Sequence, residues 1–163
     1  MQSELNLSSP TTNELAAWRL FLESAHALID ILDGELQEQS GISLRWYDVL
    51  VHLEEAPDSR LRMNELARQI VASKSGLTRV VDGMGRAGLV QRERPSSDRR
   101  VIEVVATSKG LDVLEAARPL HRDALQRHFV RHLDDRDVKA LTRALTKVRD
   151  EVRPLRAAQI GGS

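Results

Sequence analysis

Apolar residues recur at steps of three and four along the first part of the chain. Between Asn13 and about Gln39 they stand at Leu15, Trp18, Leu22, Ala25, Ile29, Leu32 and Leu36. This spacing predicts a long amphipathic helix, and Gly41 is placed to end it. A shorter helix is predicted from Leu44 to about Glu54, and the string APDSR then closes it as a turn.

Two further helices are predicted after this turn. The string MNELARQI places Met63, Leu66, Ala67 and Ile70 on one helical face. Ser73 is a suitable N-cap for the next helix, which should run to about Ala87 and end at Gly88. The apolar face of this second helix is formed by Leu77, Val80, Val81 and Met84.

The period then changes from that of a helix to that of strands. LVQRER and VIEVVA, rich in valine and isoleucine, flank a charged turn and predict a β-hairpin. Thr107 or Ser108 should cap a long helix, in which Pro119 favours a kink. Asp134 should cap a last helix, whose apolar stripe is Val138, Leu141, Leu145, Val148 and Val152.

A short helix, a tight turn, a second helix and a hairpin together predict a winged helix-turn-helix. The expected fold class is mainly α with a small β-hairpin, in which long helices flank the winged core. These outer helices carry apolar stripes longer than a lone winged domain can cover, so we expect a two-fold homodimer. The predicted division is a helical dimerisation region at 13–43 and 108–155, a winged DNA-binding domain at 44–107, and flexible tails at 1–12 and 156–163.

The composition narrows the class of protein. The chain has 163 residues, of which 41% are hydrophobic and only 3% aromatic, so Leu, Val, Ile and Ala must form the core. It has no cysteine, which excludes disulfides, thiol catalysis and thiol-based redox sensing. The sequence shows neither a membrane-span pattern nor a signal pattern, and we therefore expect a cytoplasmic protein.

The net charge is zero, yet the charges are unevenly distributed. Residues 1–58 contain 11 acids and 2 bases, whereas residues 59–163 contain 13 acids and 22 bases. Residues 73–100 alone carry 7 bases and 3 acids. This asymmetry indicates a polyanionic partner for the basic part, although a solvated surface of mixed sign would also produce it.

Duplex DNA is a partner that suits this arrangement. The second helix of such a motif enters the major groove and presents its N-terminal end to the bases. The residues predicted there are hydroxyls and cations, namely Ser73, Lys74, Ser75, Thr78 and Arg79.

The hairpin carries four arginines around its turn. An arginine on a thin β-turn can reach into the narrow and strongly negative minor groove. We expect this role for Arg100, with Arg99 beside it and Asp98 aiming the guanidinium. Arg92 and Arg94 are better placed for flanking phosphates.

The stretch ELARQIVASKSGLTRVVDGMGRAGLVQRERPSSDRRVIEVVATSKG resembles the DNA-binding core of the MarR (multiple antibiotic resistance regulator) family. The matching features are LA in the first helix, LTRVVDGM in the recognition helix, then GLV, DRR and a Thr-Ser-x-Gly helix entry. ISLRWYDVLVHL resembles the family's second helix, and the outer helices resemble its dimerisation part, so roughly residues 13–153 are covered. Gly83 and Gly85 stand where the family usually has larger residues, which should weaken the helix by up to ~1 kcal/mol per glycine.

The resemblance implies a transcriptional regulator, most often a repressor, that binds a pseudo-palindromic operator as a homodimer. It also implies release by a small anionic or phenolic effector held between the dimerisation helices and the DNA-binding lobe. Trp18, Asp48 and Arg79 resemble the Trp, Asp and Arg of the urate-responsive branch, and His26 lies further along the first helix. An Asp48–Arg79 pair would join the dimer side to the recognition helix. Packing by Trp18, a purely structural Asp48–Arg79 pair, and a constitutive DNA binder without an effector remain open alternatives.

The five histidines suggest one further alternative. His128 and His132 have the i, i+4 spacing of a zinc pair, but a third ligand, such as His121 or a carboxylate, would have to come from folding. This alternative is a zinc-responsive regulator of the same fold. No HExxH motif or glycine-rich phosphate loop is present, so we predict neither an enzyme nor a cofactor. A pure scaffold protein would not need cations at both the recognition helix and the wing.

Overall fold

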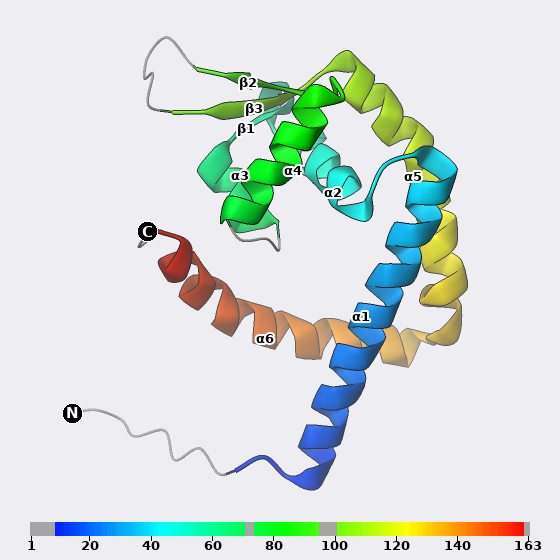
Figure 1. The fold of residues 1–163 in the computed structure, drawn as a ribbon. Helices are drawn as coiled ribbons and strands as arrows, with labels where there is room; N and C mark the ends of the chain where they lie inside the picture. The colour runs from blue at the N-terminus through cyan, green and yellow to red at the C-terminus, as the bar shows by residue number, and fades with distance from the viewer. Residues whose placement is uncertain (1–8, 71–73, 95–100, 162–163) are drawn as a thin grey trace, which may run out of the picture.

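The computed structural model describes residues 9–70, 74–94 and 101–161, without the side chains of 74–75 and 156–161. The helices, in chain order, are α1 (Thr12–Ser40), α2 (Leu44–Glu54), the 3-10 turn η1 (Pro57–Ser59), α3 (Met63–Gln69), α4 (Lys74–Arg86), α5 (Ser108–His128), the 3-10 turn η2 (Val130–His132) and α6 (Asp135–Gly161). The strands are β1 (Arg60–Arg62), β2 (Val90–Glu93) and β3 (Glu103–Ala106). Figure 1 shows a winged unit of α2, α3, α4 and the sheet beside α1 and α5.

Several helix ends lie at local capping signals. A capping box at Thr11 and Glu14 starts α1, and Gly41 ends it in the left-handed conformation with φ 73°. Thr107 is the N-cap of α5, and the side chain of Asp134 accepts the backbone N–H groups of Arg136 and Asp137 at the start of α6. α5 continues as one helix across Pro119.

The sheet has one strand more than the sequence predicted. β3 lies in the centre, with β1 and β2 antiparallel on either side, and Leu61 pairs with Val104 across the β1–β3 ladder. We predicted only a turn at APDSR, and this prediction was incomplete. β1 was missed because three residues with one apolar side chain are too short to show a strand period.

A second difference concerns the end of the chain. We predicted a flexible tail from residue 156, but α6 continues through Pro154 to Gly161. The start of α1 likewise takes in Thr12, which we had placed in the N-terminal tail. No helix in the described part of the chain is both long enough and apolar enough to cross a membrane.

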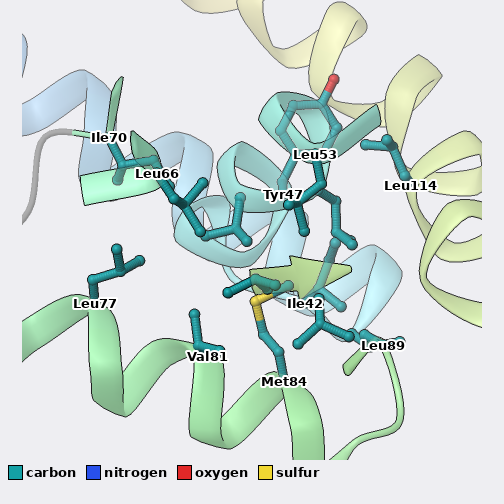
Figure 2. Close-up of a cluster of buried hydrophobic side chains, with 14 of the residues drawn as sticks. Ile42, Tyr47, Leu53, Leu66, Ile70, Leu77, Val81, Met84, Leu89 and Leu114 are labelled. Carbon is teal, nitrogen blue, oxygen red and sulfur yellow. The ribbon is translucent and has the colours of Figure 1, made fainter. Parts of the chain in front are cut away.

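The hydrophobic core lies inside the winged unit and is mostly aliphatic, as the composition predicted. Figure 2 shows Leu77, Val81 and Met84 projecting from one side of α4 into a cluster that also contains Leu66 and Ile70. The largest fully buried side chains are Leu50, Leu53, Leu66, Leu77, Met84, Leu114, Val49, Val81 and Val104. Since Leu114 belongs to α5, this core also joins the winged unit to the long helices.

α5 is attached to the winged unit through a backbone contact that needs a glycine. A Cβ atom at Gly110 would lie 2.2 Å from the carbonyl oxygen of Leu89, which precedes β2. The Thr107 hydroxyl accepts the Gly110 N–H at 3.0 Å and lies 2.7 Å from the Gly88 carbonyl oxygen. The glycine of the Thr-Ser-x-Gly string therefore permits the close approach of α5 to the turn after α4.

We predict that Gly110→Ala destabilises the protein by ~1–3 kcal/mol or more, because the new methyl group meets backbone rather than a movable side chain. Gly85→Ala is the matched control, since a Cβ there would lie 4.0 Å from its nearest neighbour. That variant should gain up to ~1 kcal/mol from helix propensity. Urea unfolding checks both values, and equal stability of the two variants would contradict the proposed contact.

Candidate DNA-binding interface

The orientation of α4 is set by its buried face. Leu77 and Val81 are 1% exposed and Met84 is fully buried, so this side of the helix faces α2 and α3. Thr78 and Arg79 follow Leu77 by one and two positions and are exposed. Because each residue advances a helix by about 100°, burying the Leu77 side presents Thr78 and Arg79 outward.

Gly83 allows α4 to lie close to α2. A Cβ atom at this position would lie 3.1 Å from the Trp46 ring. We noted Gly83 only as a weak helix former, and its spatial role could not be read from the sequence. Gly83 therefore lowers the helix propensity of α4 but allows the indole of Trp46 on α2 to lie close to the α4 backbone.

The predicted DNA-contacting residues fall into three groups. Thr78, Arg79 and Arg94 are exposed, the first two on α4 and Arg94 directly after β2. Lys74 and Ser75 lie in the first turn of α4, but their side chains are not described. The remaining predicted residues lie outside the described residues, namely Ser73, Asp98, Arg99 and Arg100.

Arg92 differs from our expectation. We predicted that it reaches a flanking phosphate, but its guanidinium is turned toward α4. Nη1 lies 2.7 Å from Asp82 Oδ1, and Nη2 donates to the Thr78 carbonyl oxygen at 3.3 Å. The hairpin and the recognition helix are therefore connected by a side chain that the sequence analysis had assigned to DNA.

The other face of the hairpin carries a separate charge cluster. Glu93 and Glu103 are directly opposed in the β2–β3 ladder, a like-charge pairing that is unfavourable by itself. Arg60 of β1 lies within 3.2 Å of Glu93 and 3.5 Å of Glu103. One arginine thus compensates two carboxylates at the end of the β2–β3 ladder that is nearer the hairpin turn.

Lys109 fixes the C-terminal end of α4. Its ammonium donates to the Ala87 carbonyl oxygen at 2.8 Å, next to Gly88 with φ 74°. A cation at the C-terminal end of a helix is favourable because the last carbonyl groups carry partial negative charge. Lys109 thereby stabilises the turn between the recognition helix and the wing, a role that was not predicted from the sequence.

The described contacts of the predicted effector residues are with other side chains. The carboxylate of Asp48 is 3.6 Å from His52 Nε2, one turn along α2, and no ion pair joins it to Arg79 among the described residues. Burial raises the pKa of Asp48, and the nearby His52 opposes that shift. Trp18 is 56% exposed and stacks on Phe21, while His26 is exposed on α1. The expected Asp48–Arg79 pair is therefore wrong.

The zinc alternative is not supported. α5 ends at His128 and His132 belongs to η2, so the two histidines do not share a continuous helix. Nε2 of His128 lies 2.6 Å from Glu35 of α1, and Arg127 pairs with the same carboxylate at 2.5 Å. Hydrogen bonding from His128 lowers the pKa of Glu35. No group of three histidines or carboxylates in the described part of the chain could hold a metal ion.

An open cavity of about 1010 Å³ lies between α6 and the winged unit. Its apolar lining comes from Phe21 of α1, from one face of α6 and from Ala56, Pro57 and Leu61 of the winged unit. Its charged lining residues are Glu55, Arg68, Arg149 and Arg153. His52 also lines the cavity. Two of the predicted effector residues lie beside it, because Trp18 stacks on Phe21 and Asp48 contacts His52. Arg79 and His26 are not among the lining residues.

Comparison with known proteins places these features in a family. The MarR family model matches residues 40–101. The HTH-type transcriptional repressor YetL of Bacillus subtilis (strain 168) is 35% identical over 81 residues, which are 50% of this chain and 48% of YetL. The chain thus spans only about half the length of that curated relative.

Two solved structures from Streptomyces coelicolor are similar over nearly the whole chain. The MarR family transcriptional regulator AbsC has a TM-score of 0.83 and 34% identity, covering 91% of this chain and 99% of AbsC. Sco3205, a MarR family transcriptional regulator solved in complex with DNA, has a TM-score of 0.85 and 33% identity, covering 90% of this chain and 92% of Sco3205. This chain belongs to the MarR family.

Proposed function

We propose that this protein is a transcriptional repressor that binds a pseudo-palindromic operator in duplex DNA as a homodimer. The observation that carries the proposal is the outward face of α4, where Thr78 and Arg79 are exposed while the opposite face is buried. Membership of the MarR family and the likeness to Sco3205, which was solved with DNA, support it.

In this proposal α4 reads the major groove and the hairpin contacts the flanking DNA. Arg79 has the length and the donors to reach a base edge, and Arg94 is exposed for a phosphate. On the sequence alone, Arg100 and Arg99 are proposed for the minor groove, where a cation meets a strong negative potential. The N-terminal end of α4 adds backbone N–H groups that favour a phosphate.

The homodimer is supported by apolar side chains on the outer helices that have no cover within the chain. On α1, Leu15, Trp18 and Phe21 are 42–56% exposed, and on α6 the stripe from Val138 to Leu155 is 36–66% exposed. Large contiguous apolar surface of this kind marks an interface. A second copy of the same chain carries the same stripes, and a two-fold dimer can bury both sets.

An effector is a further candidate role, favoured by the cavity beside α6. We propose that a planar anion binds in the part of this cavity that lies beside the dimer interface, with its charge near Arg149 and Arg153. Such a ligand lowers DNA affinity only if it prefers a conformation that does not bind DNA. A tenfold loss requires about 1.4 kcal/mol of coupling.

The DNA contacts are tested by measuring affinity at several salt concentrations. Arg79→Ala should weaken binding to duplex from upstream of the protein's own gene by ~1–3 kcal/mol and reduce discrimination against a scrambled duplex. Arg94→Ala should weaken both duplexes equally and lower the salt slope by about 1. Arg143→Ala, an exposed arginine on α6, is the control and should change neither. If Arg79→Ala protein discriminates between the two duplexes as well as wild type does, the proposal that Arg79 of α4 recognises the base sequence is wrong.

The dimer is tested by placing a charge on the apolar face of α6. Leu145→Glu should raise the dimer dissociation constant about a hundredfold or more, since each copy loses ~1.5–3 kcal/mol of leucine burial. Arg143→Glu makes a larger change of charge on the opposite face and should leave the dimer intact. Sedimentation equilibrium measures both. A wild-type monomer at micromolar concentration, bound to DNA as one chain per site, would contradict the proposal.

The effector site is tested by calorimetry with salicylate and urate. Binding should be detectable, and the double variant Arg149→Ala/Arg153→Ala should weaken it about tenfold or more, because the anion loses its cations. Arg143→Ala is again the control. If neither compound binds, or if the double variant binds as tightly as wild type, the cavity is not the effector site.

A further inference from the structure

The ion pair between Arg92 and Asp82 joins the two elements that the proposed function assigns to DNA. Arg92 lies on β2, two residues after the buried Val90, and therefore on the strand face that packs on α4. Its guanidinium reaches Asp82 at 2.7 Å and the Thr78 carbonyl oxygen at 3.3 Å. These two acceptors stand four residues apart, so one planar side chain spans one turn of the recognition helix.

The exposure of this pair limits what it can contribute to folding. The side chains of Arg92 and Asp82 are 37% and 42% exposed. Exposed ion pairs add little to stability, because water screens the charges and two side chains lose freedom. The contact can restrict orientation more than it adds to stability, because the planar guanidinium holds two donors in a fixed relative geometry.

The position of the contact decides which movement it opposes. α4 and β2 are connected through the short turn at Gly88, and Arg92 lies near the opposite end of β2 from this turn. Thr78, whose carbonyl Arg92 binds, precedes Arg79 on the same turn of α4. A swing of the hairpin away from α4 therefore has to break both contacts of Arg92.

We propose that the Arg92–Asp82 pair holds the wing at a fixed angle to the recognition helix, and that Arg92 is a positioning residue rather than a phosphate contact. The inference rests on the proposed DNA-binding function. With the angle fixed in the free protein, the wing and Arg79 meet the same half-site without a further ordering cost.

The two roles for Arg92 predict opposite effects of removing Asp82. If Arg92 binds a phosphate, Asp82 is an obstacle that neutralises it, and Asp82→Ala should tighten DNA binding. If the pair positions the wing, Asp82→Ala should weaken binding although a negative charge has been removed. Asp112→Ala removes the same charge from an exposed position on α5 and is the matched control.

The experiment measures affinity for duplex from upstream of the gene, by fluorescence anisotropy over a range of salt. Asp82→Ala and Arg92→Ala should each weaken binding about fivefold, or about 1 kcal/mol at 1.4 kcal/mol per tenfold. The salt slope should stay unchanged, whereas a lost phosphate contact lowers it by about 0.9. The charge-reversed pair Asp82→Arg/Arg92→Asp should recover part of the loss, and thermal melts show that each variant is folded.

Several outcomes would overturn the positioning role. They are tighter or unchanged binding by Asp82→Ala, a slope lowered by about one in Arg92→Ala, and no recovery in the reversed pair. Weakening by Asp112→Ala equal to that of Asp82→Ala would also overturn it. Wild-type protein that binds no duplex would instead refute the proposed function, so the two failures are distinguishable.

Discussion

The exposed surface of the winged unit depends on the burial of one side of α4. Leu77, Val81 and Met84 are almost completely buried, and each such side chain contributes ~1.5–3 kcal/mol when removed from water. Since a helix is stiff, burying one stripe also fixes its rotation about its own axis. The outward direction of Thr78 and Arg79 is therefore a result of core packing and needs no interaction of its own. Gly83 sets the distance to α2 at the same time, because any larger residue meets Trp46.

The features predicted correctly were those with a local signal. Helical periodicity and capping residues placed α2 at Leu44–Glu54, as the structure has it, and identified the buried face of α4. The contacts of Arg92, Asp48 and His128 were not predictable in the same way. Each depends on which of several nearby charges a side chain meets after folding, and spacing along the chain carries no information on that choice. β1 was missed for a related reason, since its strand character comes from pairing with β3.

The uneven distribution of charge has a partly internal explanation. Glu35 of α1 holds Arg127 and His128, and Glu54 of α2 holds Arg118, so acids of the first half meet bases of α5. Tyr47 stacks on His121 at 4.5 Å in the same region. Some of the excess of bases in the second half thus fastens α5 to α1 and α2. The part that remains open to a polyanion is smaller than the count of charges suggested, and it includes Arg79 and Arg94.

The two tryptophans lie in very different surroundings. Trp46 rests against Gly83 of the recognition helix, whereas Trp18 is more than half exposed on the apolar face of α1. Indole emission shifts to the blue when water is excluded from the ring. The intrinsic fluorescence of the protein therefore combines two separable signals. Trp46 reports on the contact between α2 and α4, and Trp18 reports on the covering of the apolar face of α1. Replacing either ring with phenylalanine leaves an optical probe for the other event, without an attached dye.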